Sequence, residues 1–301
     1  MRAAIIDLGT NTFNLLIYEP SKDKGFEIIH SERMSVGLGL GGINENKIAQ
    51  DAQERALKVL IEYKNTASEF GVKKINAFGT SALRDATNKS EFLSIVEKAT
   101  GIKVEVIDGL REAELIYKGV KSVHQFRNSS CIMDIGGGST EFIFVDKNGD
   151  IDYVESCNIG VARIIQKFDL ADPLNHTDEE KIVNFLNENT TATLRKMKAK
   201  TLIGASGSFD TFLNLTGREQ TSEIKSQAFD QKKFISILKR VKKSTQEERN
   251  NQDIIIEIRK KMIHIAAFKI LWAIKTFGIE ESFVSPASLK EGVVYSLEND
   301  E

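Results

Sequence analysis

The chain has 301 residues, more than the ~100–200 of a typical domain, and we expect two domains. Its 41 Lys and Arg balance 43 Asp and Glu to a formal net charge of −2, which gives no general attraction to nucleic acid or to an anionic membrane. No apolar run reaches the ~18–20 residues of a membrane-spanning helix, and residues 1–4 enter a short strand rather than a signal peptide. We therefore expect a cytoplasmic protein. Cys131 and Cys157 lie too far apart for a CxxC metal or redox motif.

The first half of the chain alternates strand and helix patterns, as α/β proteins do. Apolar or alternating runs predict strands at residues 3–6, 13–18, 25–30, 74–78 and 104–107. Amphipathic spacing predicts helices over residues 48–70, with Gly71 as the stop, from a Ser90 cap to Gly101, and over 112–123.

The second half repeats this plan. Strands are expected at residues 131–135, 142–145, 151–155, 201–203 and 283–284. Helices are expected from a capping box at Thr177 and Glu180 towards Met197, over 232–243 and 254–277, and from about 288. Residues 216–229 are polar and poorly patterned, which predicts a surface loop or a mobile flap. The predicted domains are residues 1–124 and 125–286, with the helix at about 287–301 able to pack back on the first.

Two turns rich in glycine and hydroxyl residues each follow a buried strand, at residues 7–12 (DLGTNT) and 134–140 (DIGGGST). Glycines let the backbone approach a ligand, and successive N–H groups can line one concavity that holds phosphate. The leading Asp would repel phosphate unless a hard cation such as Mg²⁺ lay between them. The pair predicts two phosphate half-sites facing each other across an interdomain cleft; two ordinary glycine turns are the alternative.

A third turn of the same kind, at residues 204–208 (GASGS), follows the strand predicted at 201–203. Ser208 precedes a helical pattern, and the amino end of a helix attracts anions. This turn is therefore a third candidate contact for phosphate.

Six motifs together resemble the exopolyphosphatase and guanosine pentaphosphate phosphohydrolase (Ppx/GppA) family. They are residues 7–12, 79–86 (GTSALRDA), 112–113 (EA), 134–141 (DIGGGSTE), 160–163 (GVAR) and 204–207 (GASG), and their order and spacing agree over nearly the whole chain. The resemblance implies an α/β protein of two ribonuclease-H-like domains, of the actin-like superfamily, that close over phosphates. Longer members carry a further C-terminal module, so the chain resembles the short form.

The resemblance implies that Glu112 is the catalytic glutamate, which orients the attacking water; a solvated residue in a first helical turn is the alternative. The metal candidates, for Mg²⁺, are Asp134, Asp7 and Glu141. The expected phosphate-binding residues are Thr10, Asn11, Thr12, Arg84, Gly136, Gly137, Gly138, Ser139, Thr140, Gly207 and Ser208. Arg84 is expected as a charged clamp, because a guanidinium can grip phosphate bidentately; a surface salt bridge is its alternative.

The sequence also departs from the family pattern. Asn14 stands where many members have Arg, and Gly37 and Leu40 stand where a basic and an acidic residue are common. Lys261 replaces a usual Asp, and Lys290 a usual Arg. These changes suggest a weaker grip on long chains, another phosphate substrate or reduced activity.

The leading functional prediction is an exopolyphosphatase that releases orthophosphate from inorganic polyphosphate with Mg²⁺. The alternatives are a guanosine pentaphosphate phosphohydrolase, a phosphate-binding sensor without turnover, and a sugar kinase of the same superfamily. The expected partner is polyphosphate or another phosphoanhydride substrate, without nucleic acid or membrane; a homodimer is expected from the family only.

Overall fold

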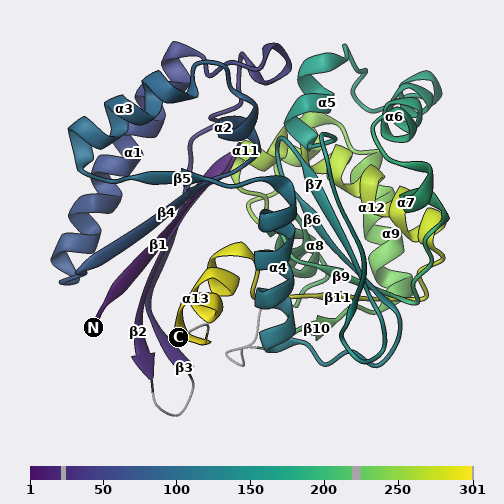
Figure 1. Ribbon diagram of the computed structural model, residues 1–301. Coiled ribbons are helices and arrows are strands. Elements are labelled where there is room, and N and C mark those ends of the chain that lie inside the picture. Colours follow the sequence, from purple (N-terminus) through teal and green to yellow (C-terminus); the bar gives the residue numbers. More distant parts are fainter. Residues whose placement is uncertain (22–24, 219–224, 300–301) are drawn as a thin grey trace. The chain divides into compact units, whose positions relative to one another are not determined.

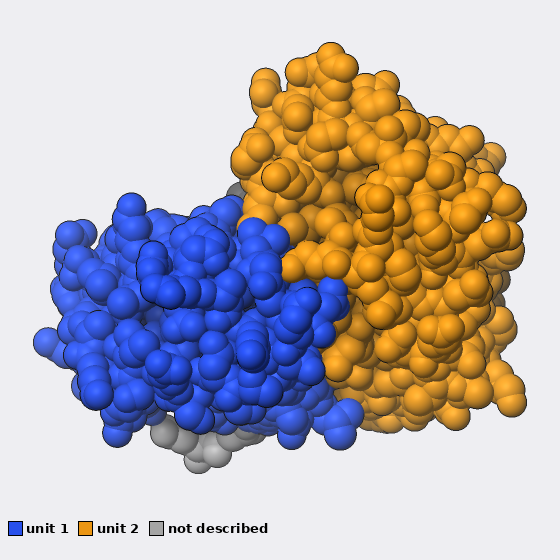
Figure 2. Space-filling model, turned by 90° about the horizontal axis from the view of Figure 1, so that it is seen from above, with its two compact units in different colours: residues 1–119, 289–301 blue, residues 120–288 orange. Residues whose placement is uncertain are grey.

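The computed structural model describes residues 1–21, 25–218 and 225–299 of the chain (Figure 1). By its internal contacts the chain divides into two compact units, coloured separately in Figure 2. Unit 1 comprises residues 1–119 and 289–301, and unit 2 comprises residues 120–288. The first boundary falls inside helix α4 (Gly109–Val123), a few residues before the boundary expected from the sequence.

The sheet of unit 1 has five strands in the order β3-β2-β1-β4-β5. The strands are β1 (Ala3–Leu8), β2 (Thr12–Ser21), β3 (Gly25–Ser35), β4 (Lys74–Gly79) and β5 (Val104–Val106). β1 pairs antiparallel with β2 and parallel with β4. All five predicted strands of this half are confirmed, and β1 lies at the centre with Ala4, Ile5, Ile6 and Leu8 buried.

The helices of unit 1 pack on both sides of this sheet (Figure 1). They are η1 (Ile43–Glu45), α1 (Gln50–Glu69), α2 (Ser81–Asp85), α3 (Lys89–Thr100), α4 and α13 (Leu289–Asn299). α1 contacts α3, whereas α13 contacts β1, β2 and β3. Gly71 follows α1 with a φ of 69°, a conformation that favours glycine. The cap predicted for α3 is wrong, since Asn88, and not Ser90, is the N-cap residue.

α13 also lies very close to α4, and one glycine makes this possible. A Cβ atom at Gly292 would lie 1.7 Å from the carbonyl oxygen of Leu115. Only a residue without a side chain fits there. α13 therefore packs against the middle of α4, beside Leu115 and Gly119.

The sheet of unit 2 repeats the same strand order with one added edge strand, β10-β11-β9-β6-β7-β8. Its strands are β6 (Ser130–Ile135), β7 (Thr140–Val145), β8 (Ile151–Cys157), β9 (Thr201–Gly204), β10 (Gln227–Ala228) and β11 (Glu281–Val284). β6 pairs antiparallel with β7 and parallel with β9, as β1 does with its neighbours. The α/β class and the duplicated ribonuclease-H-like sheet are thus confirmed.

The helices of unit 2 are α5 (Val161–Lys167), α6 (His176–Glu188), α7 (Ala192–Lys196), α8 (Gly207–Leu215), α9 (Gln231–Lys242), α10 (Gln246–Asn250), α11 (Glu257–Lys260) and α12 (Ile263–Phe277). The predicted capping box is wrong, because Asn175 is the N-cap of α6 and accepts from Asp178 N at 2.9 Å. The helix predicted over 254–277 is in fact two, with Met262 as the N-cap of α12.

Part of the polar loop predicted at 216–229 lies outside the described residues, and 227–228 form the edge strand β10. In the described ranges, no helix combines the length and the apolar character needed to cross a membrane.

Candidate phosphate-binding site

Asp7 ends the central strand of unit 1 and carries an incompletely satisfied carboxylate. Asn14, its partner on β2, donates from Nδ2 to Asp7 Oδ2 at 2.9 Å. No residue in the described part of the chain hydrogen-bonds the buried Oδ1. Burial raises the pKa of Asp7 to about 6. The Asn14 hydrogen bond and the positive charges of Lys290 and Arg33 oppose this rise, so the carboxylate is one that a cation would stabilise.

Asn14, which departs from the family pattern, links Asp7 to a basic residue on the next strand. Its Oδ1 accepts from Arg33 Nε at 2.9 Å, and the two residues are paired in the β2–β3 register. The sequence suggested that a basic group was missing near the first turn. The structure instead places Arg33 one side chain away from Asp7.

The backbone amides of residues 36–39 stabilise the first turn by hydrogen bonds to its carbonyls. The carbonyl of Asn11 accepts from Val36 N at 3.0 Å and Gly37 N at 2.8 Å, and that of Thr10 accepts from Gly39 N at 3.0 Å. Gly37 has a φ of 62°, which favours glycine. The glycine at this departure from the family pattern therefore supports the turn that contains Thr10, Asn11 and Thr12.

Glu112 and Arg84 form an ion pair. The sequence had indicated both residues as site candidates, but not their contact. Glu112 lies in the first turn of α4 and Arg84 in the last turn of α2. Arg84 Nη1 donates to Glu112 Oε2 at 2.7 Å, and their side chains are 10% and 18% exposed for Glu112 and Arg84, respectively. Arg84 Nη1 also donates to the carbonyl of Ile107 at 3.3 Å. The arginine therefore holds the orientation of the candidate catalytic carboxylate.

In unit 2, the carbonyls of the glycine turn point towards the amino end of α5. Gly136 O accepts from Val161 N at 3.1 Å, Gly137 O from Ala162 N at 2.8 Å and Gly138 O from Gly160 N at 3.1 Å. Arg163 is buried and donates from Nε to Gly138 O at 2.8 Å. A Cβ at Gly160 would lie 2.1 Å from Gly137 O. The motif 160–163 thus supports the turn from its carbonyl side.

The amides of the same turn divide into two groups. Gly136 N donates within the turn, to Ser139 O at 3.1 Å, whereas the amides of Gly137, Gly138 and Ser139 donate to no other residue in the described ranges. The Thr140 hydroxyl donates to Ser139 O at 2.9 Å. Three successive amides are therefore available to an anion, while Gly136 and Thr140 hold the turn in shape.

Asp134 and Glu141 lie directly opposite each other in the β6–β7 register. Ser288 Oγ donates to Asp134 Oδ2 at 2.9 Å, and Ser156 Oγ donates to Glu141 Oε1 at 2.8 Å. Like charges opposite one another destabilise a sheet unless a cation offsets them. This pair and Asp7 are oxygen ligands of the kind that Mg²⁺ accepts.

The described residues include no group of three or more His, Cys, Asp or Glu placed to hold a metal ion. Mg²⁺ does not need one, because it is usually bound by one or two carboxylates together with phosphate oxygens and water. Within unit 1 the orphaned Oδ1 of Asp7, and within unit 2 the Asp134–Glu141 pair, are each carboxylates of a kind that fits Mg²⁺ bound with phosphate oxygens.

Lys269 is a charged residue near this turn that the sequence reading missed. It lies inside α12 with no exposure, and its Nζ donates to Thr140 Oγ1 and, at 2.6 Å, to the carbonyl of Ile159. Burial lowers the pKa of Lys269 to about 7, while Glu141, Cys157 and Asp134 favour its charged form. A lysine within a long apolar helix was the only sign in the sequence.

The third turn leads into α8, with Ser206 as the N-cap residue. The amide of Ala205 donates to Met133 O on β6 at 3.1 Å, so this turn lies next to the strand that carries Asp134. Gly207 and Ser208 begin α8, where backbone amides lack partners within the helix. They remain candidates for binding an anion.

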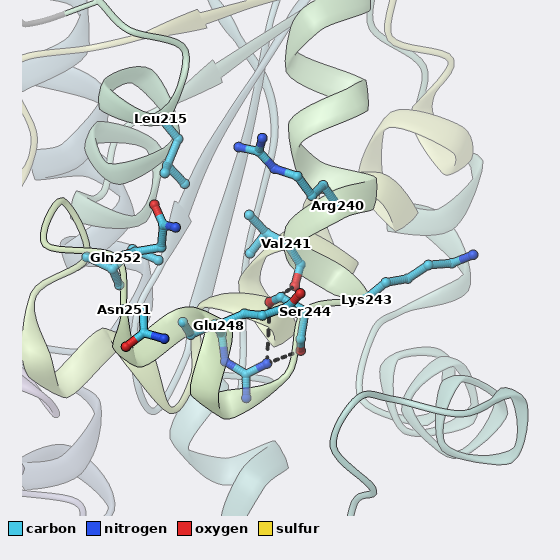
Figure 3. A pocket seen from close by; sticks show the side chains of 10 residues that line it. Leu215, Arg240, Val241, Lys243, Ser244, Glu248, Asn251 and Gln252 are labelled. Carbon is cyan, nitrogen blue, oxygen red and sulfur yellow. Dashed lines mark hydrogen bonds between the residues drawn. The ribbon is translucent and has the colours of Figure 1, made fainter.

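A cavity away from these turns lies in unit 2 and has a volume of about 540 Å³ (Figure 3). Its lining comes from the end of α8, the end of α9 and the α10 region, including Arg240, Ser244 and Gln252. None of the predicted phosphate or metal residues lines it.

Comparison with known proteins agrees with these features. The model of the Ppx/GppA phosphatase family matches residues 16–301. An exopolyphosphatase structure from Cytophaga hutchinsonii is 36% identical with a TM-score of 0.93, covering 100% of this chain and 98% of that one. A family member from Aquifex aeolicus is 27% identical with a TM-score of 0.79, covering 99% and 97%.

Among curated proteins, a guanosine-5'-triphosphate,3'-diphosphate pyrophosphatase of Photobacterium profundum is 25% identical over 98% of this chain and 59% of its own length. A bifunctional 3-dehydroquinate synthase/phosphatase of Fusobacterium nucleatum is 40% identical over 60% of this chain and 28% of its own length. The chain spans less than two thirds of these relatives. The resemblance seen in the sequence is confirmed, and the chain belongs to the Ppx/GppA phosphatase family.

Proposed function

We propose that the chain is a Mg²⁺-dependent exopolyphosphatase, which hydrolyses the terminal phosphoanhydride of inorganic polyphosphate and releases orthophosphate. The observation that carries this proposal is the partly buried ion pair between Glu112 and Arg84, at 2.7 Å. Hydrolysis needs a carboxylate held in one orientation to position water or accept its proton. The likeness to an exopolyphosphatase over the full chain favours polyphosphate as the substrate.

In this proposal, the residues divide the work by their chemistry. Glu112 orients the attacking water, and Arg84 fixes Glu112. The amides of Gly137, Gly138 and Ser139 bind phosphate oxygens. The carbonyls of Gly137 and Gly138 accept hydrogen bonds from the amino end of α5, which keeps the turn in place. Asp7, Asp134 and Glu141 are the residues that would hold Mg²⁺, which neutralises charge on the phosphates when bound.

Guanosine pentaphosphate is the second candidate substrate. The curated relatives that cover 98% of this chain are named for that activity, at 25% and 27% identity. Both substrates end in a phosphoanhydride, so the same groups would serve either reaction.

A substitution at Glu112 tests the proposal. Glu112→Gln keeps the size and a hydrogen-bond acceptor for Arg84 but removes the base, so turnover should fall by at least about 100-fold with little change in tripolyphosphate affinity. Glu114→Gln is the matched control, because Glu114 lies on the same helix with its side chain 45% exposed. Parallel loss of affinity and turnover in Glu112→Gln would show that Glu112 does not act on the water.

A further inference from the structure

Lys269 is fully buried, and its two hydrogen bonds join the end of the glycine turn to the segment that precedes α5. One acceptor is Thr140 Oγ1, at the end of the turn. The other is the carbonyl of Ile159, 2.6 Å away and directly before Gly160. The amide of Gly160 in turn donates to Gly138 O at 3.1 Å. Lys269 therefore connects the last residue of the turn with the segment that supports its carbonyls.

The acceptor geometry fixes the Thr140 hydroxyl. This hydroxyl receives the Lys269 ammonium and directs its own hydrogen to Ser139 O. Ser139 O also accepts from Gly136 N at 3.1 Å. A chain of hydrogen bonds thus runs from the buried ammonium through Thr140 to the backbone that closes the turn.

The ammonium group of Lys269 also interacts electrostatically with two carboxylates, those of Asp134 and Glu141. Asp134 and Glu141 are a like-charged pair directly opposite each other on β6 and β7, and Glu141 is only 1% exposed. Such a pair is unfavourable without a cation nearby. Both carboxylates favour the ammonium form of Lys269, which opposes the effect of burial on its pKa.

We infer that Lys269 is a positioning residue, whose ammonium ties Thr140 to Ile159 and so holds the 136–140 turn in the shape that binds phosphate. It does not touch the substrate. This inference rests on the proposed function, because it assigns the phosphate contact to that turn. It predicts that Lys269 sets the affinity for the phosphate chain more than the rate of the chemical step.

Lys269→Met tests this, since methionine has a similar length but no donor and no charge. Tripolyphosphate with Mg²⁺ is the probe, measured by titration calorimetry for Kd and by steady-state orthophosphate release for KM and kcat. Loss of charged hydrogen bonds that hold the turn should raise Kd and KM about 10- to 100-fold, with kcat changed by less than about threefold. Ile270→Val, at the next buried position of the same helix, should leave all three constants unchanged.

A second variant keeps the test decisive if Lys269→Met does not fold. Thr140→Val removes the hydroxyl acceptor at nearly constant size and should also raise Kd. Where Lys269→Met does fold, the double variant should raise Kd by less than the product of the two single increases, because both substitutions remove the same hydrogen bond. Unchanged Kd in the folded single variants, or full additivity, would overturn the inference.

The same titrations separate this inference from the proposed function. A wild-type chain that binds tripolyphosphate without releasing orthophosphate would refute hydrolysis alone, and the Kd values of the variants would still decide the role of Lys269. A wild-type chain that binds no tripolyphosphate would refute both.

Discussion

At Asp7, the folded chain favours the protonated side chain, whereas the proposed binding of Mg²⁺ needs the ionised carboxylate. Its carboxylate has an oxygen without a partner among the described residues, and burial raises its pKa from 3.8 to about 6. A folded-state pKa above the unfolded value means that the carboxylate is tolerated best when protonated. The stability contributed by the protonated form is complete below pH 3.8 and is lost as the pH rises through about 6.

We therefore expect Asp7→Asn to stabilise the chain at pH 8 in the absence of metal, by roughly 1–2 kcal/mol. The asparagine keeps an acceptor for Asn14 and removes the buried charge. Thermal unfolding of both proteins at pH 8 and at pH 4 measures this, and the difference should shrink at the lower pH. Equal melting temperatures at pH 8 would contradict the expectation.

Asp146 offers the opposite case for comparison. It is half-buried, and the hydrogen bond from the Asp150 amide is the main factor that lowers its pKa. Asp146→Asn should lower the melting temperature at pH 8, whereas Asp7→Asn should raise it. Two carboxylates that differ in surroundings thus give changes of opposite sign.

At the scale of the element, the amino end of α5 and the glycine turn form one unit of backbone hydrogen bonds. Their closest approach is at Gly160, where a Cβ would lie 2.1 Å from Gly137 O. Because both groups are backbone, neither can move aside as a side chain could. The shape of the turn therefore depends on a glycine outside it.

Gly160→Ala should lower the free energy of unfolding by about 1–3 kcal/mol, as overpacking does, and should raise the KM for tripolyphosphate. Urea unfolding and steady-state kinetics measure the two effects. Ser236→Ala, at an exposed position on α9, is the control and should change neither. A fully active, equally stable Gly160→Ala would mean that the turn does not need this close approach.

The sequence predicted elements better than it predicted their ends. Strands such as β1 and β6 are apolar runs that stop at an Asp, and every strand predicted from such a run is present. The predicted caps at Ser90 and Thr177 were wrong, because Asn88 and Asn175 precede them and each also suits a cap position. Local patterns cannot rank neighbouring polar residues that are all acceptable caps.

The site shows a similar division. Motif spacing identified the turns and indicated Glu112 and Arg84 as site candidates. It did not predict their ion pair, because the two residues lie on different helices. Lys269 was missed because a helix period indicates which face is buried and not which distant carbonyl a lysine reaches. Arg33 was missed because its link to Asp7 depends on strand register and on Asn14.

At the scale of the whole molecule, unit 2 contains two histidines that resist protonation. Burial lowers the pKa of His124 and of His264 from 6.5 to about 4. Their neutral forms are therefore favoured by folding, and stability is complete above pH 6.5. It is lost as the pH falls from 6.5 towards 4, where the unfolded chain takes up protons first.

We expect the stability of the wild-type chain to fall between pH 7 and pH 4.5, and His264→Leu to weaken this fall by up to about 3 kcal/mol. Urea unfolding at a series of pH values measures it. His176→Gln is the control, because the side chain of His176 is 87% exposed. If His264→Leu and wild type showed parallel pH profiles, His264 would not be a source of the acid sensitivity.

We expect the hydrolase activity of the chain to depend on Glu112. Orthophosphate release with Mg²⁺ should be measured for tripolyphosphate, long-chain polyphosphate and guanosine pentaphosphate side by side, with wild type, Glu112→Gln and Glu114→Gln. We predict release by wild type and Glu114→Gln, greatest from polyphosphate, and almost none by Glu112→Gln. Binding of these compounds by the wild type without any release would contradict hydrolysis and indicate a phosphate-binding sensor.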